Sequence, residues 1–137
     1  MPPSDKRVIR SPKLPTGRGP YSPAIRVGNL LFVSGHGPID PATDQVVRAD
    51  FATQVRRTLD NLKLLLEEAG ASLGHVVKTT VYLSDMNNFQ TLNEIYAAYF
   101  PTDPPARTTI QAARLPLDFD VEIECIAWVN EGERVKG

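Results

Sequence analysis

An arginine and a glutamate in the last third of the sequence have the side-chain types that acid–base chemistry on a small carboxylate requires. Arg107 follows residues 104–106 (PPA) and opens a predicted strand, where a rigidly held guanidinium suits capture of a carboxylate through two parallel hydrogen bonds. Glu122 lies in the next predicted strand, which is a candidate neighbour of the Arg107 strand, and a general base needs only reach and a suitable pKa. The residues alone also allow a simpler interpretation, in which Arg107 forms a surface salt bridge and Glu122 is a solvated carboxylate.

Two further polar residues stand where packing or turn formation would also explain them. Asn93 interrupts an apolar helical stripe within residues 89–100, and a buried amide must find partners, either in a loop or in a ligand. Ser34 ends a short apolar run just before Gly35, so its hydroxyl could either contact a ligand or satisfy the turn.

The motifs of several enzyme classes are absent from the sequence. It has no phosphate-binding loop, no GxGxxG, no CxxC, no HExxH and no GxSxG. His36 and His75 do not have the paired spacing of metal ligands, so no metal site is predicted. Cys125 falls in the middle of a predicted strand, where a small core residue is a better interpretation than a nucleophile.

Composition points to a soluble protein of one domain. The 137 residues carry a net charge of −1, with 42% hydrophobic and 23% charged residues. Binding to nucleic acid or to a membrane surface through bulk charge is therefore not expected. The single cysteine cannot form an intramolecular disulfide, and no apolar stretch approaches the roughly 20 residues of a membrane helix. A cytoplasmic location is expected, with no signal peptide.

The elements that must position these residues can be read from periodicity and turn signals. Residues 30–34, 76–83, 107–112 and 120–129 are predicted strands, and residues 51–69 and about 88–100 are predicted helices. A Pro- and Gly-rich loop covers residues 11–23, so residues 1–18 are partly loop-like within one domain, 1–137. This order predicts an α+β fold in which a single sheet has two helices on one face.

The last predicted strand alternates between two kinds of side chain. Residues 121, 123, 125, 127 and 129 are apolar and are expected to face the helices, whereas Glu122, Glu124, Ile126 and Trp128 face the other way. A self-association surface with a polar site at its edge would explain this mixed face. An exposed sheet face with an incidental tryptophan explains it equally well.

Six segments spread over nearly the whole chain resemble the Rid (YjgF) family. They are GPYSPA (19–24), FVSGHGPID (32–40), VVKTTVYLSDMNNF (76–89), LNEIYAAYF (92–100), PARTTIQAARLP (105–116) and VEIECIA (121–127). The resemblance implies a chorismate-mutase-like fold and a homotrimer with a site in each of three intersubunit clefts. It also implies hydrolysis of reactive enamines or 2-imino acids to 2-oxo acids and ammonia, without a metal or organic cofactor.

The same resemblance assigns roles to individual residues. Arg107 matches the arginine that binds the substrate carboxylate, and Glu122, selected over Glu124 by the VEIE block, matches the glutamate that positions the hydrolytic water. The other matched residues line the pocket or lie beside the ligand: Tyr21, Ser34, Gly35 and Asn93. Glu124 is expected to pair with a cation or a backbone donor at an interface.

Three positions depart from the commoner family pattern. Thr109 stands where many members have cysteine; since that position is thought to act through its backbone carbonyl, threonine should preserve hydrolysis. His36 and Gly37 replace a glutamine and a bulky apolar residue, which we expect to change the size and polarity of the pocket.

Two other functions remain as alternatives at this stage. The cleft could bind a small carboxylate or a protein without turnover, although binding alone would not need a base such as Glu122. An endoribonuclease or translation-inhibitor role has been proposed for some relatives, but near-neutral charge and the lack of an aromatic–basic stripe count against it.

Overall fold

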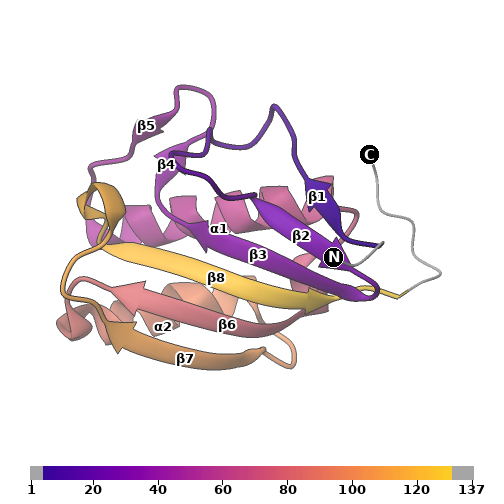
Figure 1. The fold of residues 1–137 in the computed structure, drawn as a ribbon. Coiled ribbons are helices and arrows are strands. Elements are labelled where there is room, and N and C mark those ends of the chain that lie inside the picture. The colour runs from indigo at the N-terminus through magenta and orange to yellow at the C-terminus, as the bar shows by residue number, and fades with distance from the viewer. Residues whose placement is uncertain (1–4, 131–137) are drawn as a thin grey trace.

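The computed structural model describes residues 5–130, and its main feature is a six-stranded sheet in the order β1-β2-β3-β8-β6-β7 (Figure 1). Its strands are Arg7–Ile9 (β1), Ala24–Val27 (β2), Leu30–His36 (β3), Val76–Leu83 (β6), Ala106–Gln111 (β7) and Val121–Trp128 (β8). Neighbouring strands are antiparallel except β6 and β7, which are parallel because a helix connects them. A separate hairpin, Ile39–Asp40 (β4) and Gln45–Val46 (β5), follows β3.

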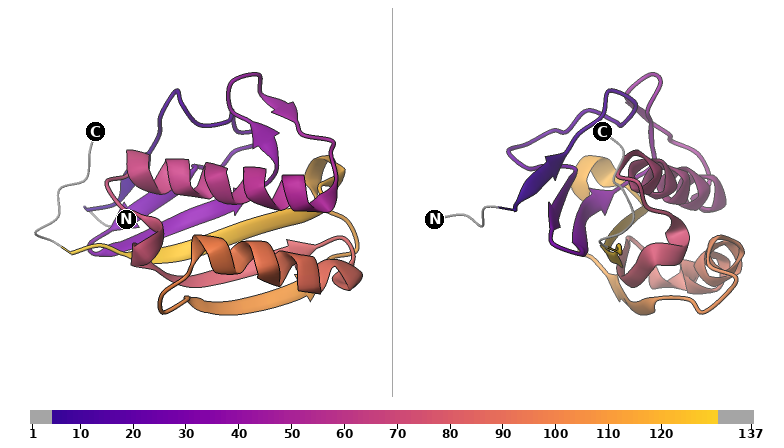
Figure 2. Two further views of the ribbon diagram at one scale, coloured as in Figure 1. Left: turned by 180° about the vertical axis from the view of Figure 1, so that it is seen from behind. Right: turned by 90° about the vertical axis from the view of Figure 1, so that its right-hand side faces the viewer.

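Two helices cover one face of this sheet (Figure 2). Helix α1, Phe51–Glu68, begins where the Asp50 carboxylate accepts a hydrogen bond from the Thr53 amide at 2.9 Å. It ends before Gly70, whose φ of +80° is a left-handed conformation that favours glycine. Helix α2, Phe89–Tyr99, ends just before Pro101. Both predicted helices are confirmed.

The core lies between the sheet and the helices. The alternation predicted for the last strand is confirmed, because residues 121, 123, 125, 127 and 129 of the chain are at most 3% exposed. From α1, the four side chains Leu59, Leu62, Leu65 and Leu66 are fully buried against them. Each such leucine contributes about 1.5–3 kcal/mol relative to an exposed one.

The opposite face of the sheet is only partly covered within this chain. Glu122, Glu124 and Ile126 are half-buried there, whereas Leu30, Phe32 and Trp128 are exposed. Three large apolar side chains on one open sheet face are unusual for a surface that meets only water.

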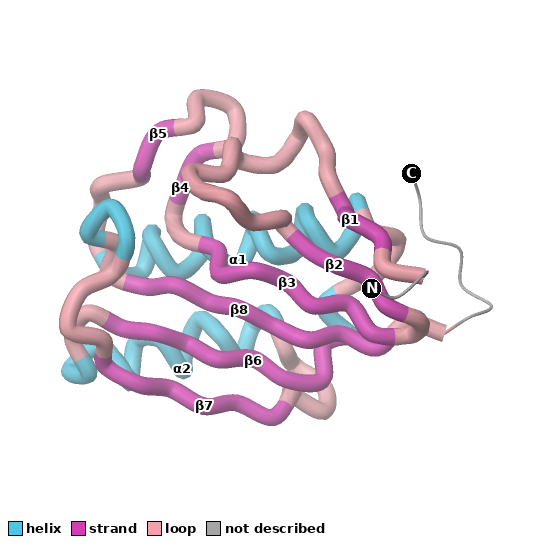
Figure 3. The backbone as a smooth tube through the Cα atoms, in the orientation of Figure 1, coloured by secondary structure: helices cyan, strands magenta, loops and turns pink. Residues whose placement is uncertain are grey.

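The sheet order corrects one expectation from the sequence. Sequence order suggests that Arg107 and Glu122 lie on neighbouring strands, but β6 lies between β7 and β8. The short strands β1 and β2 and the β4–β5 hairpin are not predicted from the sequence; the tube in Figure 3 shows how much of this region is loop. No helix among residues 5–130 is long and apolar enough to cross a membrane.

Candidate functional site

A cavity of about 590 Å³ opens at the end of the sheet where β3 stops and β8 begins. Its walls come from the loop of residues 14–23, the end of β3, the short 3₁₀ turn Pro116–Asp118 (η3) and the start of β8. Four of the predicted site residues line this cavity: Tyr21, Ser34, Gly35 and Glu122.

Glu122 extends from the sheet face that points away from the helices and lies directly over Gly35. A Cβ added to Gly35 would lie 2.5 Å from Glu122 Oε1, so any other residue at position 35 would displace the carboxylate. A bulge makes this approach possible, because the β3–β8 register shifts between Val33 and His36. Partial burial, followed by the charge of Glu124, raises the pKa of Glu122 above its ordinary value.

Ser34 holds the pocket loop rather than pointing freely into the cavity. Its hydroxyl donates to the Ser22 carbonyl at 2.6 Å, and its amide donates to the Pro23 carbonyl at 3.0 Å. Tyr21, 53% exposed, lies in the same loop, and its phenol oxygen accepts a long hydrogen bond of 3.4 Å from the Arg18 amide.

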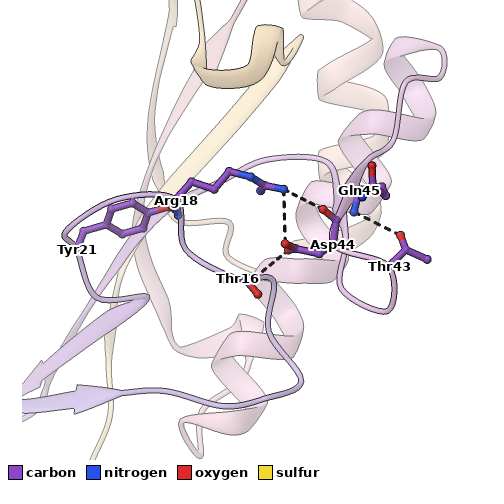
Figure 4. Close-up of polar contacts among 6 residues, drawn as sticks. All are labelled: Thr16, Arg18, Tyr21, Thr43, Asp44 and Gln45. Atoms are coloured by element: carbon purple, nitrogen blue, oxygen red, sulfur yellow. Dashed lines mark hydrogen bonds and ion pairs between the residues drawn. The ribbon is translucent and has the colours of Figure 1, made fainter.

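A second connection ties this loop to the β4–β5 hairpin through Asp44 (Figure 4). The Asp44 carboxylate accepts from the Thr16 amide at 3.0 Å, and Arg18 Nη2 donates to the Asp44 carbonyl at 2.8 Å. Arg18 Nη2 and Asp44 Oδ2 also form an ion pair at 3.6 Å. Asp44 has a φ of +59°, a left-handed conformation that aspartate adopts more readily than most residues. The sequence indicates only turn residues in this segment; its contact with the loop depends on chain geometry that no local motif reveals.

His36 and Gly37 both line the cavity, but neither simply enlarges it. Burial lowers the pKa of His36 to about 4, so the imidazole is neutral near pH 7, and its Nε2 atom is buried without a hydrogen-bond partner among residues 5–130. The space beside Gly37 is occupied by the ring of Phe119.

Glu124 pairs differently from our expectation of a cation or a backbone donor. The Tyr82 hydroxyl donates a hydrogen bond to Glu124 Oε1, and this bond together with burial raises the pKa of Tyr82 to about 12. Tyr82 lies opposite Glu122 in the β6–β8 register. Tyr82 therefore holds in place the Glu124 carboxylate, whose negative charge lies near Glu122.

A second group of site residues surrounds Arg107 on the helix side of the sheet. Arg107 Nη2 donates to Asn93 Oδ1 at 2.7 Å, and the guanidinium carbon lies 4.8 Å from the Tyr96 ring centre and 5.4 Å from that of Phe89. The Asn93 oxygen therefore orients the arginine. Thr109, two residues along β7, has a buried hydroxyl with no partner among the described residues.

The two groups cannot act on one small ligand within a single chain. Arg107 lies opposite Thr79 on β6, and Thr79 lies opposite Cys125 on β8. With strands about 4.8 Å apart and roughly 3.4 Å per residue, Arg107 is about 10 Å sideways and about 10 Å along the sheet from Glu122. The two side chains also leave opposite faces of the sheet. Within one chain, a ligand of a few atoms would not span this separation.

Two other kinds of reactive side chain are the Cys125 thiol and the groups that could bind a metal. Burial raises the pKa of the Cys125 thiol to about 12, which agrees with its assignment as a core residue. Among residues 5–130, no three histidine, cysteine, aspartate or glutamate side chains cluster as metal ligands would.

Fold and side chains together define a small α+β protein with a partly desolvated carboxylate in a cavity and a separately oriented arginine. Residues 12–129 match the family model described as Endoribonuclease L-PSP, and the chain therefore belongs to that family. The resemblance to the Rid (YjgF) family is confirmed by the relatives that follow.

Relatives of this chain extend over nearly its whole length. A RutC family protein of Pyrococcus abyssi is 50% identical over 123 residues, which are 90% of this chain and 97% of the relative. The 2-iminobutanoate/2-iminopropanoate deaminase of Escherichia coli K12 is 42% identical over 124 residues, 88% of this chain and 96% of that protein. The crystal structure of the E. coli YjgF gene product superposes with a TM-score of 0.85 at 41% identity, over 90% of this chain and 99% of that one.

Proposed function

We propose that this protein is an enamine/imine deaminase that hydrolyses 2-imino acids to 2-oxo acids and ammonia. The observation that carries the proposal is the presence of two functional groups: a partly desolvated carboxylate at Glu122 and a pre-oriented guanidinium at Arg107. The first suits a base and the second suits a carboxylate-bearing substrate. The deaminase name carried by the E. coli relative supports the same reaction.

The reaction that these residues support has few steps. Arg107 binds the carboxylate of the 2-imino acid through two parallel hydrogen bonds. Glu122 accepts a proton from water while the water oxygen bonds to C2, and the C=N electron pair moves to nitrogen. The proton held by Glu122 then passes to that nitrogen, which gives a neutral amino alcohol. Glu122 next accepts the proton of the new hydroxyl group and transfers it to the amine, the C–N bond breaks as the C=O bond forms, and ammonia and the 2-oxo acid leave. Proton transfer of this kind raises the reaction rate about 10²–10⁴-fold.

We further propose that the working form is a homotrimer in which Arg107 of one subunit completes the cavity of its neighbour. The separation of Arg107 from Glu122 supports this arrangement, because one chain does not bring them to the same ligand. The open face with Leu30, Phe32 and Trp128 supports it as well, since a neighbouring sheet would cover these side chains. Asn93 and Thr109 would accompany Arg107, whereas Tyr21, Ser34 and Gly35 would accompany Glu122. A cytoplasmic location fits a chain with one unpaired cysteine.

Activity can be tested with an imine generated in situ by a threonine dehydratase, in the presence of an amine that traps free imine. We expect 2-oxo acid to appear faster with the protein than without it, and the trapped product to fall accordingly. Equal rates with and without the protein would contradict the deaminase assignment.

The composite site has its own test. Differently tagged Arg107→Ala and Glu122→Gln chains are co-expressed, and mixed oligomers are isolated through both tags. In a composite trimer some sites combine an intact Arg107 from one chain with an intact Glu122 from the other, so activity should return although each pure variant is nearly inactive. Mixed oligomers without activity would show that both groups must come from one chain.

A further inference from the structure

The Phe119 side chain forms a wall of the cavity and rests directly on Gly37. Phe119 is 5% exposed, and a Cβ added to Gly37 would lie 2.5 Å from its Cδ2 atom, 2.8 Å from Cζ and closer still to Cε2. Contacts this short do not occur in folded proteins, so the ring occupies the place that any side chain at position 37 would take.

The backbone beneath the ring cannot readily move away. The Gly37 carbonyl accepts from Asn61 Nδ2 at 3.1 Å and from the Ile39 amide at 2.9 Å. Asn61 is fully buried, and its own Oδ1 accepts from Arg57 Nε at 3.2 Å. A helix α1 side chain therefore fixes the segment on which the ring rests.

The ring is also held from its own side. The Phe119 amide donates to the Pro116 carbonyl at 3.2 Å, and Leu117 and Asp118 within that turn both have left-handed φ values of +57°. The next residue, Asp120, bonds to Gln54 of α1 through both its amide and its carboxylate. A ligand in the cavity would meet a wall supported from both sides.

This wall lies next to the proposed base. Gly35 admits the Glu122 carboxylate in the same way that Gly37 admits the ring, and the two glycines are only about 6.5–7 Å apart along the chain that leaves β3. A carbon atom under attack by a water on Glu122 would carry its substituent into the space bounded by Phe119.

We infer that Phe119, seated on Gly37, sets the size limit for the side chain of the 2-imino acid that the enzyme hydrolyses. This inference rests on the proposed deaminase activity. It makes position 119 a specificity-determining position, and it makes Gly37 the residue that permits an aromatic ring there. Imino acids with short unbranched side chains fit beside the ring, and branched or aromatic ones collide with it.

The experiment compares imines generated from alanine, leucine and phenylalanine by an L-amino-acid oxidase, with wild type and Phe119→Val. A single methylene in an apolar pocket changes discrimination by roughly 10–200-fold. We therefore expect the kcat/KM ratio of the leucine-derived to the alanine-derived imine to rise at least about tenfold in Phe119→Val. Leu59→Val is the control: it removes one methylene from a fully buried side chain outside the cavity and should leave the ratio unchanged.

A second pair of variants tests the contact between Phe119 and Gly37. Gly37→Ala should lower turnover of every substrate because the ring must move into the cavity, and adding Phe119→Val to it should restore turnover. If Phe119→Val does not assemble, Phe119→Leu measures the same ratio with a smaller change in volume. An unchanged ratio in an active variant overturns the inference, whereas a wild-type protein that accelerates none of the three imines overturns the proposed activity itself.

Discussion

Glu122 and Arg107 differ in how many contacts each side chain makes within the protein. Arg107 is bonded to Asn93 and stacked on two aromatic rings before any ligand arrives. The Glu122 carboxylate makes no hydrogen bond to any of residues 5–130, and it is partly buried beside a second carboxylate. A group that must bind one fixed shape gains from being oriented in advance, whereas a group that must accept a proton gains from an environment that makes its charge costly.

The largest expected effect comes from removing the oriented group. Arg107→Ala removes the two charge-assisted hydrogen bonds proposed to hold the substrate carboxylate, worth about 4 kcal/mol together, so kcat/KM should fall about 10³-fold. Arg107→Lys should recover only part of this loss, because an ammonium cannot reproduce the planar fork. Steady-state kinetics at low substrate concentration provide the measurement. Wild-type turnover in Arg107→Ala would mean that the carboxylate is bound elsewhere.

Glu122→Gln should have the next largest effect and should act on a different step. The amide keeps the size of the side chain but cannot accept a proton from water, so kcat should fall on the order of 10²-fold. Binding of a 2-oxo acid, measured by calorimetry, should remain close to that of wild type. Parallel loss of binding and turnover would instead assign Glu122 a role in holding the substrate.

Loosening the loop that carries Tyr21 should have a smaller effect. Asp44→Ala removes the contacts of the carboxylate to Thr16 and Arg18, and exposed pairs of this kind are worth about 0.2–1 kcal/mol. We expect KM to rise about two- to fivefold while kcat stays nearly constant. Asp44→Asn keeps the oxygen that accepts from the Thr16 amide and tolerates the left-handed backbone, so it should recover most of the loss. A change confined to kcat would contradict a role in positioning the loop.

The smallest effect concerns the pH profile. The proposed mechanism requires ionised Glu122, so activity should fall as the pH drops through the raised pKa of this residue. The negative charge of Glu124 contributes to that elevation, and Glu124→Gln should therefore move the acidic limb of the kcat profile to lower pH. Turnover near neutral pH should change little, since the amide oxygen introduced by Glu124→Gln can still accept the hydrogen bond from Tyr82. If the acidic limb of the profile does not move, burial alone raises the pKa of Glu122.

Elements with long, regular patterns can be predicted from the sequence, and short ones cannot. Helix α1 and strand β8 repeat their apolar residues over many positions, so their buried faces are predicted correctly. Strand β1 has only three residues and carries Arg7 at an exposed position, which leaves no pattern to detect. Strand order is also beyond reach, because nothing in the composition of β6 indicates that it separates β7 from β8.

The candidate site divides in a similar way. The types of Arg107 and Glu122 suggest their chemistry, but their placement on opposite faces follows from sheet order and the position of α2. Contacts such as Arg18 with Asp44, or Phe119 with Gly37, join segments that are distant in sequence, and neither member of such a pair is unusual by itself. The roles of these residues can therefore be inferred only from the folded structure.

The stacking of Arg107 on Tyr96 and Phe89 has a consequence for the entropy of ligand binding. A free arginine side chain has about 2 kcal/mol of rotamer entropy to lose when it is immobilised. Here Asn93 and the two rings restrict those rotamers as the protein folds. Much of the ordering therefore precedes the encounter with substrate, and a short-lived metabolite can be captured without the delay and free-energy cost of arranging the side chain around it.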